Sequence, residues 1–166
     1  MSKNCLITGA AGFIGSHTTD KMLAQGYRVF GVDNMVLGKR ANITAALRSP
    51  NFVFQELDVN DLKGFREFLQ AQTKGQSIGA VWHMAANSDI QAGGNDPDID
   101  LQRTFLTTYN TLKMAQEFKI PQFVFASTSA IYGELGGALT EQSGPLHPIS
   151  NYGAMKLASE GVITAA

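Results

Sequence analysis

A tyrosine and a lysine four residues apart could carry acid–base chemistry in this sequence. Tyr152 and Lys156 lie in residues 151–166, which have helical character, so the two side chains would share one helical face. A phenol is a poor base at neutral pH, but a nearby ammonium group and the positive charge of an oxidised nicotinamide would both favour the phenolate. Thr128 would hold a substrate hydroxyl against Tyr152. The three residues predict proton removal from that hydroxyl while hydride leaves its carbon for a nicotinamide.

Tyrosine–lysine pairs at this spacing also occur on ordinary amphipathic helices, so the catalytic interpretation needs a second signal. A glycine-rich turn in residues 4–16 provides it, because this segment predicts a buried strand, a tight turn and the start of a helix. Gly9 would permit the turn, Gly12 would let the backbone approach a diphosphate, and Gly15 would let the helix pack on the sheet. The diphosphate would then lie on the helix N-terminus. No Gly-Lys-Ser/Thr follows, which argues against a nucleoside-triphosphate P-loop.

An acidic residue at the end of the second predicted strand indicates which dinucleotide is bound. Residues 27–33 read as this strand, and Asp33 closes it 24 positions after Gly9. A carboxylate there accepts hydrogen bonds from the hydroxyls of the adenosine ribose and repels a 2′-phosphate. We therefore predict NAD in preference to NADP, although Lys39 and Arg40 would soften the repulsion.

Several other polar residues have both a functional and a structural interpretation. Asp58 could bind the adenine amino group with Val59 against the ring, or it could cap the next helix. His83 is expected to be a packed, hydrogen-bonded residue rather than a proton shuttle. Cys5, the single cysteine, is expected to be a buried apolar residue rather than a reactive thiol. The three histidines lack metal-ligand spacing, and we predict no metal site.

Length and composition are those of an ordinary globular domain. The chain has 166 residues, 44% of them hydrophobic, and a formal net charge of −1. This balance predicts neither nucleic-acid nor membrane binding. The sequence shows no apolar run of membrane-spanning length and no signal peptide at its start, so we expect one cytoplasmic domain over residues 1–166.

Strand and helix patterns alternate along the chain, which predicts a Rossmann-type α/β fold with a doubly wound parallel sheet in the order 3-2-1-4-5. Further strands are expected at residues 51–56, 80–84 and 122–127, and helices at 13–25, 40–48 and, capped by Asp61, from residue 62. Residues 91–95 read as a polar mobile loop, Asp96-Pro97 as a helix start, and the apolar stripe from Leu101 to Phe118 as core or a helix-pairing surface. Ligands of such sheets lie beyond the carboxyl ends of the strands, so one cleft would collect the predicted site residues.

These motifs together resemble the N-terminal part of an extended short-chain dehydrogenase/reductase, of the NAD-dependent sugar epimerase/dehydratase family. The resemblance covers nearly the whole chain and implies NAD, a nucleotide-sugar substrate, a transient ketone and a homodimer. It implies that Tyr152 is the base, Lys156 its partner and a nicotinamide-ribose ligand, and Thr128 the substrate-positioning hydroxyl. The predicted cofactor-binding residues are Gly9, Gly12, Phe13, Ile14, Gly15, Asp33, Asn34, Asp58, Val59, Met84, Ala85, Ala86, Ser127, Tyr152 and Lys156.

The chain departs from the family pattern in three ways. Related 4,6-dehydratases have an Asp-Glu pair where this chain has Ser129-Ala130, so water elimination is disfavoured. Thr107 stands where an asparagine of the family is expected. Family members also continue for about the same length again, with the domain that binds the sugar nucleotide, so the chain reads as truncated before its substrate domain.

Three functions remain open from the sequence. The first is a redox isomerase of the 4-epimerase type, and the second is a net NAD-linked sugar dehydrogenase or reductase. The third is an NAD-binding module without activity of its own, which the short length would favour.

Overall fold

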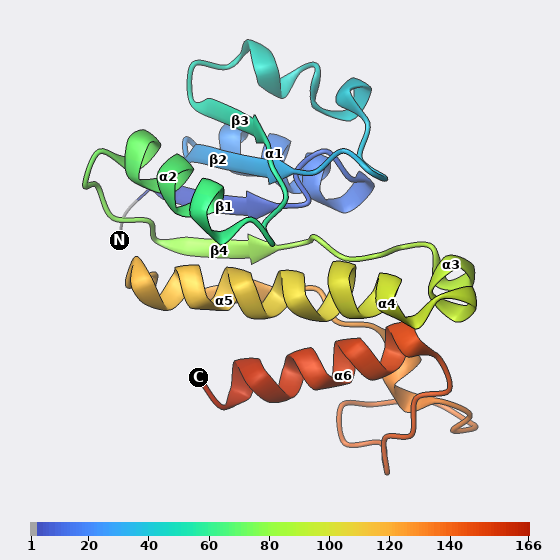
Figure 1. The fold of residues 1–166 in the computed structure, drawn as a ribbon. Coiled ribbons are helices and arrows are strands. Elements are labelled where there is room, and N and C mark those ends of the chain that lie inside the picture. The colour runs from blue at the N-terminus through green and yellow to red at the C-terminus, as the bar shows by residue number, and fades with distance from the viewer. Residues whose placement is uncertain (1–2) are drawn as a thin grey trace. The chain divides into compact units, whose positions relative to one another are not determined.

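The computed structural model describes residues 3–166. It contains a five-stranded parallel sheet, part of which is seen in Figure 1. The strands are β1 (Asn4–Thr8), β2 (Arg28–Asp33), β3 (Phe52–Glu56), β4 (Ala80–His83) and β5 (Phe123–Phe125), in the order β3-β2-β1-β4-β5. In register, Thr8 pairs with Val32 of β2 on one side and with His83 of β4 on the other. The predicted order is confirmed, and the strands are one to three residues shorter than predicted.

The chain divides into two compact units, which we describe separately. The first contains the sheet and comprises the chain up to Ala85 together with Asn110–Phe125. Its helices are α1 (Phe13–Ala24), α2 (Leu62–Thr73) and most of α5 (Thr107–Glu117). Asp61 caps α2 as predicted, because its side chain accepts a hydrogen bond from the Gly64 N–H at 3.0 Å.

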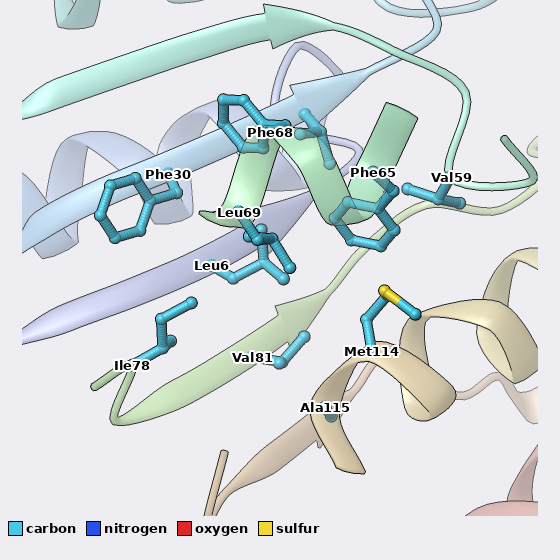
Figure 2. Packing of buried hydrophobic residues seen from close by; sticks show 11 residues of the cluster. Leu6, Phe30, Val59, Phe65, Phe68, Leu69, Ile78, Val81, Met114 and Ala115 are labelled. Atoms are coloured by element: carbon cyan, nitrogen blue, oxygen red, sulfur yellow. The ribbon is translucent and has the colours of Figure 1, made fainter. Parts of the chain in front are cut away.

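Apolar side chains cover both faces of the sheet in the first unit. On one face, Leu6, Phe30 and Val81 lie under Phe65 of α2 and Met114 of α5 (Figure 2). A second cluster takes the alternate strand residues, including Cys5, Ile7 and Val29. This packing on two faces fixes where the strands end, and therefore where the loops that follow β1, β2 and β4 begin.

The second unit comprises Ala86–Tyr109 and Ala126–Ala166 and is mainly helical. It contains α3 (Ile90–Asn95), α4 (Pro97–Asp100), a π-helix (Leu101–Leu106), a 3₁₀ helix (Ser129–Tyr132) and α6 (Asn151–Thr164). Contacts join α6 to α3, α4 and the π-helix. Asp96 caps α4 through the Asp98 N–H at 3.1 Å, with Pro97 in the first turn, as predicted.

Two predicted elements were wrong. Residues 40–48 form two 3₁₀ helices, Arg40–Ile43 and Ala46–Arg48, in place of the single helix predicted, and each has one buried residue, Ile43 and Ala46 respectively.

Residues 91–95, predicted to be a loop, belong to α3. The Asp89 side chain accepts a hydrogen bond from the Ala92 N–H at 3.0 Å and starts this helix. Gly93 is buried against Asp100, where any Cβ would overlap the carboxylate, so this glycine permits close packing rather than a mobile turn.

Candidate active site

The turn between β1 and α1 has the close backbone packing that its glycines predict. Gly9 has a φ of 68°, and a Cβ on it would lie 2.7 Å from the Ala85 nitrogen. A Cβ on Gly15 would overlap the Gly9 carbonyl oxygen. Both positions therefore require glycine, one for its backbone conformation and both for space.

The hydrogen bonds of this turn show which backbone donors a diphosphate could use. The Ala11 N–H donates to Asp33 Oδ2 at 3.0 Å, and the Gly12 N–H donates to the Gly9 carbonyl at 3.1 Å. The next N–H groups, of Phe13, Ile14 and Gly15, are in the first turn of α1, where a helix supplies no acceptor. No side chain caps this end of α1. The arrangement fits a diphosphate, which would accept from these donors at the positive end of the helix dipole.

We expect Gly15→Ala to damage the turn and Gly161→Ala to be harmless. The alanine Cβ at position 15 would overlap the Gly9 carbonyl, so the free energy of unfolding should fall by about 1 to 3 kcal/mol. NAD binding, measured by calorimetry, should be lost. At Gly161 in α6 a Cβ would meet nothing within 4 Å, and better helix propensity should stabilise the chain by about 1 kcal/mol. Equal stability of the two variants would contradict this account of the turn.

Asp33 is held in a fixed orientation at the end of β2. Its Oδ2 accepts from the Ala11 N–H, and its Oδ1 accepts from the Met35 N–H at 2.8 Å. Each oxygen keeps a second lone pair that a ribose hydroxyl could use. The neighbouring Asn34 side chain donates to Asp58 Oδ2 at 3.3 Å, which joins two of the predicted cofactor residues.

The residues after β3 and β4 have different surroundings. Asp58 is exposed and accepts from the Asn60 N–H at 2.9 Å, whereas the cap of α2 is Asp61. The Val59 side chain is buried in the core beside Phe65 (Figure 2), which leaves mainly its backbone for a ligand. Met84 and Ala85 are half-buried and their N–H groups bond to Thr8, at 3.1 Å and 3.4 Å respectively.

His83 and Cys5 have the structural roles predicted for them. The His83 ring is fully buried, its Nδ1 lies 2.7 Å from Thr8 Oγ1, and it stacks on Phe125. Cys5 is fully buried, and burial raises the pKa of its thiol to about 12. Neither residue is placed for proton transfer or nucleophilic attack at neutral pH.

In the second unit, the first two turns of α6 carry the tyrosine and the lysine. Ser150 caps the helix by accepting from the Gly153 N–H at 3.0 Å, which fixes where it starts. Lys156 Nζ lies 5.8 Å from the centre of the Tyr152 ring and donates to the Ala126 carbonyl at 2.6 Å. The two side chains share a helical face, as predicted.

Thr128 lies beside the phenol, at the position predicted for it. The Thr128 side chain lowers the pKa of the phenol, as a nearby hydrogen-bond donor does. Thr128 Oγ1 accepts from the Ala130 N–H at 3.2 Å, which leaves its O–H as the group that could donate to the phenol oxygen. A substrate hydroxyl that binds here would meet both oxygens.

The pKa of Tyr152 is raised above its ordinary value in the chain without cofactor, whereas the phenolate predicted from the sequence depends on bound oxidised NAD as well as on Lys156. Burial of the half-buried ring is the main cause of the higher pKa, the Thr128 hydrogen bond lowers it, and the negative charge of Asp100 raises it. Lys156 does not reverse the shift. The protein's own groups therefore keep Tyr152 a neutral phenol.

Burial lowers the pKa of Lys156 to about 8, since the side chain is only 2% exposed. Above pH 8 the folded chain releases a proton that the unfolded chain, with a pKa near 10.5, still binds. The contribution of Lys156 to stability therefore rises as the pH increases from about 8 towards 10.5.

We expect the free energy of unfolding of the wild-type chain to rise relative to Lys156→Met by about 2 to 3 kcal/mol between about pH 7 and pH 10. Urea denaturation at a series of pH values measures this difference. Lys63→Met, at a side chain that is 85% exposed, is the matched control and should show no such trend. Parallel pH curves for wild type and Lys156→Met would refute a lowered lysine pKa.

Ser127 and Ala86, both predicted to contact the cofactor, also lie in the second unit. The Ser127 hydroxyl is exposed and donates to Glu160 Oε1 on α6. Ala86 is half-buried. The other predicted cofactor residues, apart from Tyr152 and Lys156, lie in the first unit.

A buried polar cluster formed by Asn87, Asp100 and Thr104 was not predicted from the sequence and lies in the unit that carries Tyr152. All three are at most 1% exposed. Asp100 follows Asp96 and Asp98 closely in the sequence, so it resembled another exposed acid at a helix start. Its place between Ile99 and Leu101 was the one available signal of burial.

No group of three or more histidine, cysteine, aspartate or glutamate side chains within residues 3–166 could hold a metal ion. Over the same range, no helix has both the length and the apolar character needed to cross a membrane.

The chain is similar to known proteins over nearly its whole length. A model of the NAD dependent epimerase/dehydratase family matches residues 5–166. The UDP-glucose 4-epimerase of Mycolicibacterium smegmatis is 32% identical over 158 residues, which are 93% of this chain and 48% of that protein.

Solved structures show the same similarity. The UDP-Glc/GlcNAc 4-epimerase of Campylobacter jejuni has a TM-score of 0.87 at 30% identity, covering 99% of this chain and 49% of that one. The UDP-glucose 4-epimerase of Thermus thermophilus, in complex with NAD, has a TM-score of 0.83 at 33% identity, with 98% and 50% covered. The chain spans about half the length of the relatives it matches.

Proposed function

Because this chain belongs to the NAD-dependent epimerase/dehydratase family, we propose that it binds NAD and carries the catalytic side chains of a nucleotide-sugar epimerase. The arrangement at the start of α6 supports this most directly, because Lys156 Nζ lies 5.8 Å from the centre of the Tyr152 ring and the Thr128 side chain lowers the pKa of the phenol. The sugar epimerases among its relatives agree with this choice of reaction.

The cofactor would use the backbone of one turn and one carboxylate. The N–H groups of Phe13, Ile14 and Gly15 would bind the diphosphate, and Asp33 would accept from the adenosine ribose. Lys156 would donate to the nicotinamide ribose. Bound NAD would supply the acceptor for hydride.

Tyr152 would take the proton of a sugar hydroxyl at its phenol oxygen and return it in the reverse step. Thr128, by donating to the same oxygen, would hold the phenol and the substrate hydroxyl in line. The positive charge of bound oxidised nicotinamide, with that of Lys156, would offset the burial and the Asp100 charge that raise the pKa of Tyr152. Return of hydride to the opposite face of the ketone gives the epimer.

Other outcomes of the same chemistry are less well supported. The solved structures that resemble this chain include the dTDP-glucose 4,6-dehydratase DesIV of Streptomyces venezuelae. Ser129 and Ala130 lack the carboxylates that water elimination would need at this position, which favours epimerisation. A net sugar dehydrogenase or reductase would use the same three catalytic residues and release free NADH.

A function of a different class, an NAD-binding module without turnover of its own, would use the same glycine turn and Asp33. The test is conversion of UDP-galactose to UDP-glucose by the 166-residue chain and by a longer form with a C-terminal half. We expect the longer form to convert UDP-galactose to UDP-glucose without releasing free NADH. NAD binding with no turnover in either form would favour the module, and accumulation of free NADH would favour the dehydrogenase.

A homodimer is the quaternary state that we propose. The rings of Phe105 and Tyr109 stack at 6.3 Å between centres, and Tyr109 is 44% exposed, so this helical segment presents apolar surface. Light scattering after size-exclusion chromatography should give twice the mass of one chain. A monomer mass at all concentrations would contradict this.

A further inference from the structure

Asp100 is a fully buried carboxylate, and only one of its oxygens has hydrogen-bond partners. Oδ1 accepts from the Asn87 side-chain amide at 2.9 Å and lies 3.4 Å from Thr104 Oγ1. Oδ2 is buried and has no partner among the described residues. Burying a carboxyl oxygen without a hydrogen-bond partner costs free energy, so a cluster with only a structural role would be expected to supply that partner.

The rest of the cluster holds the carboxylate in place. The Asn87 N–H donates to Thr104 Oγ1 at 3.1 Å, and the Asn87 side chain donates to the Asp89 carbonyl at 2.8 Å. Thr104 belongs to the π-helix, a form that is frequent at functional sites. The charge of Asp100 therefore has a fixed position within the unit that carries Tyr152.

A series of contacts connects Asp100 with the first turn of α6. The Asp100 carboxylate lies against Gly93, where a side chain could not fit. The Gly93 carbonyl accepts from the Asn151 side chain at 2.9 Å, and Asn151 precedes Tyr152. The carboxylate also interacts electrostatically with the phenol.

We propose that Asp100 is a positioning residue for Tyr152, which holds the first turn of α6 through Gly93 and Asn151 and places a buried carboxylate in the surroundings of the phenol. This rests on the proposed function, in which Tyr152 is the base. A phenol is already neutral at neutral pH, and the carboxylate would make its ionisation depend more strongly on the positive charge that arrives with the oxidised cofactor. Asp100 would thus favour proton removal with the oxidised cofactor bound over proton removal with NADH bound.

Besides Asp100, the elements packed on α6 carry other titratable groups that could act on Tyr152. The elements packed on α6 are α3, α4, the π-helix and the 3₁₀ helix. They contribute Asp98, Asp100, Arg103 and Tyr132, and α6 itself contributes Lys156 and Glu160. Of the acidic side chains, Asp98 is exposed and Glu160 accepts from Ser127, whereas Asp100 alone is buried and acts on the phenol.

Asp100→Asn in the cofactor-free chain tests the proposal. The amide oxygen can still accept from Asn87 and Thr104, so the substitution removes charge with little change of shape. Magnetic resonance of isotope-labelled tyrosine rings follows the ionisation of Tyr152, which is assigned by its loss in Tyr152→Phe. We expect the ionisation midpoint to fall by about half a pH unit or more in Asp100→Asn. Asp98→Asn, at an exposed carboxylate of the same helix, should leave it unchanged.

An unchanged midpoint in a folded Asp100→Asn chain would overturn the proposal. If that variant does not fold, the labelled Asp100 carboxyl resonance of the wild-type chain decides instead. It must shift as Tyr152 ionises and must not shift over that pH range in Tyr152→Phe, and absence of this response would also overturn the proposal. Neither measurement requires NAD or substrate, so failure of the epimerase proposal would be seen separately, as loss of NAD binding or turnover.

Discussion

Tyr152→Phe is expected to lower epimerisation by about 10²- to 10⁴-fold while leaving NAD affinity nearly unchanged. The substitution removes only the phenol oxygen, so the ring still packs on α6 and Lys156 still donates to the Ala126 carbonyl. What is lost is the oxygen that would take the sugar proton and accept from the Thr128 hydroxyl. Conversion of UDP-galactose in the longer form, with NAD affinity by calorimetry, measures both quantities.

Tyr109→Phe is the matched control, because Tyr109 is 44% exposed and its ring stacks on Phe105 outside the predicted catalytic set. It should keep full turnover. Equal activity of Tyr152→Phe and wild type would remove the phenol from the mechanism, and equal losses in both variants would indicate a general effect on the fold.

The second large effect is expected at Asp33. Asp33→Asn should weaken NAD binding by about 10- to 100-fold, since a hydrogen bond to a charged acceptor contributes about 1.5 to 3 kcal/mol. NADP should bind relatively better, because the charge that repels its 2′-phosphate is gone. The ratio of NADP to NAD affinity is the informative quantity, since the loss of one local hydrogen bond to Ala11 or Met35 would weaken both cofactors alike.

Asp20→Asn provides the control for Asp33→Asn, because Asp20 is an exposed carboxylate on α1. It should leave the affinity ratio unchanged. If Asp33→Asn also leaves the ratio unchanged, Asp33 has only its structural role between the β1–α1 turn and the loop after β2.

The sequence was sufficient for those parts of the fold that depend on local spacing. The order of the five strands follows from alternating strand and helix patterns, and the close packing of Gly9 and Gly15 follows from their places after β1. The shared face of Tyr152 and Lys156 follows from helix geometry alone.

The features that the sequence did not reveal depend on contacts between distant segments. Gly93 looked like part of a flexible loop because its neighbour Asp100 is seven residues away. The raised pKa of Tyr152 comes from burial and from Asp100, and neither is visible in the spacing of residues on one helix. The division of residues 40–48 into two 3₁₀ helices is likewise not visible in the helix pattern of the sequence.

We propose that one NAD contacts both the glycine turn and Tyr152. The ionisation of Tyr152 in the presence of cofactor tests this most directly, because oxidised and reduced NAD differ in the charge of the nicotinamide and a nearby phenol would respond to that difference. We expect saturation with oxidised NAD to lower the midpoint, NADH to lower it much less, and Gly15→Ala to abolish the response. A midpoint that stays the same at saturating oxidised NAD would contradict it.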